Sequence, residues 1–155
     1  MTSPLPIPVD DLGTWLAELK PYQRNIINEF LASQGPESAA EKWLTTTGSQ
    51  NIVAFGGAQP NKPFWDRFKN QFHRFVCDET AFVEEKKALA TEAPVTKALM
   101  ISVISSALGA ALGLSATLLA PAVVLLLYSI GRIGVAAYCD TAPPDPPADK
   151  PVQPV

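Results

Sequence analysis

Apolar residues recur at helical spacing in three successive groups over residues 10–47. Within each group they follow the i, i+3, i+4 spacing that places side chains on one face of a helix. Pro21 and Pro36 open the second and third groups, and proline is favoured in the first turn of a helix. The pattern predicts a module of three short helices, preceded by an extended proline-rich arm over 1–9 and followed by a loop over 48–62.

A sharper pattern covers residues 63–77, where aromatic residues follow one helical face and basic residues lie opposite them. The aromatic set is Phe64, Trp65, Phe68, Phe72 and Phe75, and the basic set is Arg67, Lys69 and Arg74. This pattern is typical of a helix at a membrane interface, where aromatic rings lie at the depth of the lipid headgroups and basic side chains bind anionic lipid. We therefore predict an interfacial helix, continued by a charged linker to residue 92. The alternative is a helix that faces the core of a soluble domain.

No charged residue lies between Lys97 and Arg132. One straight helix over this run would be about 50 Å long at 1.5 Å per residue, whereas the hydrocarbon core of a bilayer is about 30 Å thick. Two crossings fit this length better than one. The sequence predicts a membrane hairpin whose helices are Thr96–Leu114 and Pro121–Tyr138. A single crossing, or a soluble hairpin masked by a partner, is the alternative.

The length and small-residue content of this uncharged run are similar to those of the hydrophobic helical hairpin of pore-forming colicins. The resemblance is one of pattern and includes no family motif. The resemblance implies a soluble protein with a buried hairpin, because the colicin hairpin is carried inside a soluble helical bundle. Against it, about 100 other residues are few to cover two helices that are apolar on all sides, which favours the membrane.

Basic residues flank the predicted hairpin on both sides, and they are Lys86, Lys87, Lys97 and Arg132. Basic flanks are retained in the cytoplasm, so both termini are predicted to be cytoplasmic, at the plasma or inner membrane. Within the first helix, small residues extend along one face, namely Ser102, Ser106, Gly109 and Gly113. Small residues let helices approach closely in lipid, which predicts a helix-packing face and self-association.

The composition excludes several classes of function. A net charge of −3 gives no electrostatic attraction to nucleic acid. The N-terminus has no apolar segment typical of a signal peptide, and two cysteines do not make a disulfide framework. His73 and Cys77 could share a helical face, but a zinc site needs further ligands that no motif supplies. We expect no catalytic residues, no cofactor, no metal site and no small-molecule substrate.

The predicted fold class is therefore all-α, with a helical N-terminal module, an amphipathic helix and a hydrophobic two-helix membrane hairpin. Residues 139–155 are rich in proline and are predicted to form a disordered tail. We expect a small, non-enzymatic integral membrane protein that perturbs membranes as an oligomeric, toxin-like effector. An adaptor that recruits a protein partner through residues 10–47 is the alternative, and a soluble protein with a masked hairpin is a second.

Overall fold

A computed structural model of the chain describes residues 7–45, 61–78, 80–91 and 96–140. Every regular element in these four ranges is a helix, which confirms the predicted all-α fold class. Three sequence predictions lie wholly or mostly outside the described residues. They are the N-terminal arm up to residue 6, the loop over 48–62 as far as residue 60, and the tail from residue 141 onward.

The N-terminal module consists of α1 (Leu12–Leu16), α2 (Pro21–Leu31) and α3 (Pro36–Trp43). Helix α1 begins where the Asp11 carboxylate accepts a hydrogen bond from the backbone N–H of Thr14 at 2.8 Å, which is an N-cap. Helices α2 and α3 begin with proline, whose missing N–H costs nothing at that position. Large apolar side chains of the module are buried, among them Trp15, Ile27, Trp43 and Leu44.

Helix α4 (Asn61–Cys77) contains the aromatic pattern, and α5 (Val83–Thr91) follows it. Between them Phe82 has a φ of 55°, in the left-handed region that bulky residues rarely adopt. Its ring packs against that of Phe75, with the two centroids 5.2 Å apart. This contact accompanies the sharp change of direction between the two helices.

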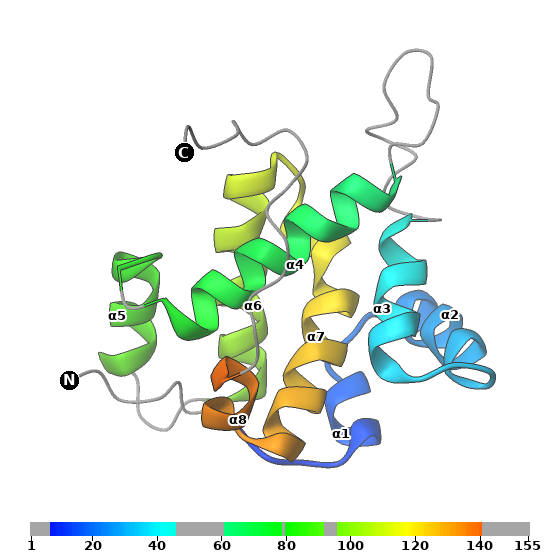
Figure 1. The fold of residues 1–155 in the computed structure, drawn as a ribbon. Helices are drawn as coiled ribbons and strands as arrows, with labels where there is room; N and C mark the ends of the chain where they lie inside the picture. Colours follow the sequence, from blue (N-terminus) through cyan, green and yellow to red (C-terminus); the bar gives the residue numbers. More distant parts are fainter. Residues whose placement is uncertain (1–6, 46–60, 79, 92–95, 141–155) are drawn as a thin grey trace, which may run out of the picture.

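The uncharged run forms α6 (Lys97–Leu112) and α7 (Ala116–Ile133), which pack against each other, and a short α8 (Val135–Asp140) follows. Figure 1 shows α7, coloured yellow to orange, in the middle of the bundle, with α6 and α3 on either side of it. Helix α1 also packs against α7, while α4 lies across α6 and reaches α8. Helix α5 covers another part of α6.

The core of the molecule is built around α7. Its buried side chains extend from Leu119 to Ile130 and join one apolar cluster with residues of α1, α3, α4 and α6. The other helices of the chain therefore cover α7 themselves. Helix α6 is covered by α7, α4 and α5 but keeps a narrow solvent-exposed face.

Candidate membrane-inserting hairpin

Helix α7 is long and apolar enough to cross a membrane, and it is the one such helix within the described ranges. Half of it is buried inside the protein, as in the core helix of a soluble bundle. Helix α6 is also apolar but shorter. The length and composition of α7 therefore fit either a membrane crossing or the core of a helical bundle.

The turn between α6 and α7 differs in position from the predicted one. Gly113 ends α6 with a φ of 79°, and its backbone N–H donates to the Gly109 carbonyl at 2.7 Å. Ser115 then caps α7, its hydroxyl accepting from the backbone N–H of Leu118 at 3.1 Å. Glycine just after a helix and serine just before the next are strong local signals. They place the start of α7 at Ala116, five residues before Pro121, which lies inside the helix.

The two glycines of the predicted helix-packing face have a different role in this structure. A Cβ atom at Gly109 would lie 2.5 Å from the Leu114 carbonyl oxygen, so only glycine lets the turn approach so closely. Gly113 adopts the positive φ that side chains disfavour. Both residues therefore serve the turn of the hairpin, whereas Ser102 and Ser106 are exposed on α6.

Pro121 creates a docking point on α7. The carbonyl of Thr117 would accept from the backbone N–H of residue 121 in a regular helix, and proline has no such group. Gln23 of α2 supplies the missing donor, because its Nε2 donates to the Thr117 carbonyl oxygen at 2.9 Å. Trp43 of α3 donates through Nε1 to the next carbonyl, that of Leu118, at 2.8 Å. The N-terminal module is thereby bonded to the first turns of α7.

The aromatic residues predicted to lie at a membrane interface are in the core of this structure. Trp65, Phe68, Phe72 and Phe75 are each at most 1% exposed, and the side chain of Phe64 lies outside the described part. The rings of Trp65 and Phe68 stack with centroids 5.7 Å apart, and the Phe72 ring meets Tyr138 of α8 at 6.4 Å. An aromatic stripe along one helical face suits a membrane interface or a protein core. In this structure the stripe of α4 packs against α6.

The basic residues on the other face of α4 have protein partners. Lys69 lies 3.6 Å from the Glu37 carboxylate of α3, and its ammonium sits over the Trp65 ring at 5.5 Å. Arg74 is paired with Asp78 at 3.9 Å, and Arg67 is also engaged within the protein. Exposed pairs of this kind contribute little to stability.

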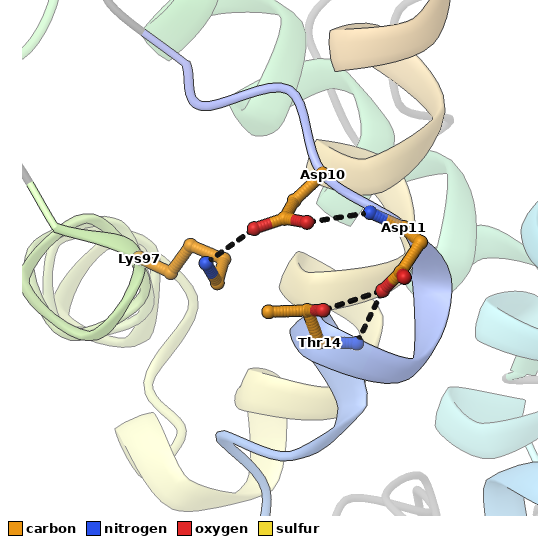
Figure 2. Close-up of polar contacts among 4 residues, drawn as sticks. All are labelled: Asp10, Asp11, Thr14 and Lys97. Carbon is orange, nitrogen blue, oxygen red and sulfur yellow. Dashed lines mark hydrogen bonds and ion pairs between the residues drawn. The ribbon is translucent and has the colours of Figure 1, made fainter.

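The basic flanks of the hairpin are held by local contacts. Figure 2 shows Lys97, the first residue of α6, bonded to the Asp10 carboxylate at 2.9 Å. Its ammonium also lies 5.9 Å from the centre of the Trp15 ring. Ahead of Asp10 the chain passes close to the end of α7, since a Cβ at Gly131 would lie 3.1 Å from the Pro8 carbonyl oxygen. Residues 7–10, here called the strap, therefore cross the base of the hairpin.

The remaining flanking cations lie on α7 and α5. Arg132 donates a hydrogen bond to the Tyr128 hydroxyl at 3.0 Å, near the end of α7. Lys86 donates to the Asp78 carbonyl oxygen at 2.5 Å, and Lys87 is exposed. Lys97 and Arg132 thus lie at the base of the hairpin, whereas Lys86 and Lys87 belong to α5, which packs along α6.

The exposed face of α6 carries no charge. Its exposed residues are Ala98, Ser102, Ser106, Ala110 and Ala111. Ser102 and Ser106 line an open hollow of about 360 Å³ with Glu84 and Glu85 of α5. The carboxylates belong to α5, so α6 itself presents only methyl and hydroxyl groups.

A disulfide joins Cys77, the last residue of α4, to Cys139 of α8. The sequence indicated no disulfide framework and did not predict this single bond, which forms because packing of α8 on α4 brings together residues 62 positions apart. Disulfides persist in oxidising compartments and are rare in reducing ones. The cytoplasmic location of both termini stays a prediction from the basic flanks.

Two titratable rings lie beside this disulfide. Burial lowers the pKa of His73, whose Nε2 has no hydrogen-bond partner among the described residues. Burial, reinforced by the negative charge of Glu37, raises the pKa of Tyr138 above its ordinary value. The His73 and Tyr138 rings lie 5.3 Å apart. Because both cysteine sulfurs are bonded to each other, they offer no thiolate to a metal ion.

Sequence reasoning did not single out the residues that hold the hairpin in place, which are Asp10, Gln23 and Trp43. A signal existed for one of them, since a proline inside a helix always frees the carbonyl four residues earlier. Comparison with protein-family models, with curated proteins and with solved structures gives no significant match.

Proposed function

We propose that this protein is a non-enzymatic membrane perturber that stores its apolar hairpin inside its own helices and inserts it into lipid. In this proposal the hairpin consists of α6 and α7, and both cross the bilayer. Helix α4 lies at the interface after insertion, with its aromatic stripe turned from the core toward the headgroups. The membrane is the partner, and no small-molecule substrate is required.

The uncharged exposed face of α6 carries the proposal. Burial explains why α7 has no charged residue before Arg132. It does not explain why the solvent-exposed positions 102, 106 and 110 of α6 hold serine, serine and alanine rather than charged residues. Exposed positions elsewhere in the chain do carry charge, as at Glu29 in α2 and Lys87 in α5. A helix that only had to stay in water could carry charges on its outer face at no cost. A helix that must enter hydrocarbon could not.

Storage and insertion are compatible in energy because one apolar environment replaces another. The side chains of α7 buried against α3 and α6 would be equally shielded from water by acyl chains. The two hydrogen bonds from Gln23 and Trp43 would be lost. Their acceptor carbonyls lie at the tip of the hairpin, where water or headgroups on the far side of a bilayer can replace both donors.

Self-association in lipid is the second part of the proposal. Ala98, Ser102, Ser106 and Ala110 recur at a spacing of four along the exposed face of α6. Small residues at this spacing let two helices pack closely in a bilayer. In this proposal the strip forms the helix-packing face between subunits. Gly109 and Gly113, first predicted to belong to that face, are required by the α6–α7 turn instead.

The adaptor alternative draws no support from the described contacts. The apolar faces of α1 and α3 pack against α7, and the side chains of Gln23 and Trp43 bond to it. A module occupied in this way presents few apolar side chains to a partner, with Tyr22 the main exception at 55% exposed. Recruitment of a partner would therefore follow release of the hairpin.

The test is a single charge on the exposed face, introduced by Ser106→Lys in the full chain. In water the new ammonium would face Glu84 and Glu85 across the hollow, so the fold should be kept. In a bilayer a lysine near the centre of a helix costs about 2.5–3.5 kcal/mol. We therefore expect release of a quenched dye from phosphatidylglycerol-containing vesicles to require about a hundredfold more of the variant.

Ser38→Lys is the matched control, because Ser38 is exposed on α3 and outside the hairpin. This control should release dye as the unaltered chain does. Circular dichroism and thermal unfolding would show that both variants fold. Equal dye release by a folded Ser106→Lys variant would contradict the proposal and leave the hairpin as the core of a soluble protein.

A further inference from the structure

The disulfide between Cys77 and Cys139 closes a loop around the whole hairpin. Cys77 ends α4, and the chain then runs through α5, α6 and α7 before it reaches Cys139 in α8. The two cysteines therefore stand on opposite sides of the hairpin in sequence and next to each other in space, with Cα atoms 5.6 Å apart. Any rearrangement that keeps the bond must keep these two points together.

Ring contacts support the same junction. Tyr138, the residue before Cys139, meets Phe72 and His73 of α4, with ring centroids 6.4 and 5.3 Å apart. These contacts are non-covalent and involve the aromatic stripe that the proposed function requires to move. The disulfide is thus the one covalent element that would still hold α8 to α4 after the stripe has left the core.

We propose that the Cys77–Cys139 disulfide is a clasp that keeps α4 and α8 on the same face of the membrane, so that α6 and α7 insert together as a pair. This inference rests on the proposed function for its membrane step. A bilayer core is about 30 Å thick, so the bonded cysteines cannot lie on opposite sides of it. An intact disulfide therefore forbids the single crossing that α7 alone could make.

Opening the clasp requires a dithiol reductant. It donates two electrons and two protons, the Cys77–Cys139 bond breaks to give two thiols, and the reductant becomes a disulfide. The flanks of the hairpin are then independent. A chain in this state can cross once through α7 as well as twice through α6 and α7.

The experiment compares the oxidised full chain with a Cys77→Ser/Cys139→Ser variant, both bound to phosphatidylglycerol-containing vesicles. External endoproteinase Asp-N, which cuts before aspartate, can cut at Asp78 before the hairpin and at Asp149 after it. The products are reduced and identified by mass spectrometry. In the oxidised chain every inserted molecule should be cut on both flanks. In the variant a fraction of inserted molecules should keep one flank protected.

A disulfide-bonded chain with one flank protected would overturn the inference, as would identical cleavage of the two proteins. The intact mass of the purified chain shows whether the bond has formed, and its absence would also overturn the inference. If neither protein enters vesicles, the proposed function fails and the membrane step of the clasp fails with it. Hydrogen exchange in water then decides whether the bond holds α8 to α4, since a clasp predicts faster exchange of α8 in the variant.

Discussion

At the scale of single residues, Pro121 connects sequence to tertiary packing. It sits inside α7 rather than at its start, and it leaves the Thr117 carbonyl without its helical donor. Gln23 fills this gap and is itself 2% exposed, and its Oε1 accepts from the backbone N–H of Lys20 at 3.2 Å. One amide side chain thus fixes the start of α2 and the position of α2 on α7.

The role of Gln23 can be measured with a double-mutant cycle. Gln23→Ala should lower the free energy of unfolding by about 1 kcal/mol, the net value of one hydrogen bond. In a Pro121→Ala background the loss should be smaller, because the alanine restores a backbone N–H that can serve the Thr117 carbonyl. Urea unfolding of the four proteins gives the coupling. Equal losses in both backgrounds would contradict this account, and Asn25→Ala, at an exposed position of α2, is the control.

At the scale of elements, the turn between α6 and α7 depends on two glycines with different physical requirements. Gly109 is needed for space, because its missing Cβ lets the Leu114 carbonyl approach. Gly113 is needed for conformation, since its φ is 79° and open space surrounds it. Two glycines four residues apart are typical of contact between membrane helices. Here they allow α6 to end in a tight turn.

The close approach at Gly109 predicts that Gly109→Ala destabilises the water-soluble fold. The added methyl group would overlap a backbone oxygen, and overpacking of this kind costs about 1–3 kcal/mol. Gly13→Ala is the matched control, because a Cβ there meets only an ordinary contact in α1, and it should stabilise the protein by about 0.5–1 kcal/mol. Thermal unfolding in the absence of lipid measures both effects. A Gly109→Ala variant as stable as the unaltered chain would point back to a contact between subunits.

At the scale of the whole molecule, the hairpin base is closed from two sides. The disulfide closes one side through α4 and α8. The strap closes the other, with Asp10 bonded to Lys97 of α6 and Pro8 beside Gly131 of α7. Asp11, the residue after the strap, is the N-cap of α1. Its carboxylate also accepts a hydrogen bond from the Thr14 hydroxyl (Figure 2).

The strap predicts a dependence of stability on pH. The hydrogen bond from Lys97, and next the backbone N–H of Asp11, hold the pKa of Asp10 below its ordinary value of 3.8. A lowered pKa in the folded state means that Asp10 stabilises the fold above that ordinary value, and that this contribution is lost as pH falls through the folded pKa. Asp10→Asn should therefore lower the urea midpoint at neutral pH and have little effect in strong acid. Asp140→Asn, at an exposed position in α8, is the control. A constant difference between Asp10→Asn and the unaltered chain at all pH values would count against the strap.

How much the sequence could predict depends on whether a feature is local. The all-α class followed from helical spacing and from prolines at helix starts, which are properties of neighbouring residues. Gly113 and Ser115 also indicated the position of the α6–α7 turn locally, as a helix end and a helix start. Our prediction was wrong there because it started the second helix at Pro121 instead. Pairing of Cys77 with Cys139, and of Asp10 with Lys97, was not available, because nothing local relates positions so far apart.

By itself, the sequence determined that this chain is helical and that one uncharged run is apolar enough to need shelter from water. Only the tertiary structure decided what provides that shelter. The stripe of Trp65, Phe68 and Phe72 suits a bilayer interface or a protein core equally well, since both offer an apolar surface. In the structure that surface is α6, while α7 is covered by the N-terminal module. The choice depends on which surfaces meet after the chain folds, and periodicity within one helix carries no information about its neighbour.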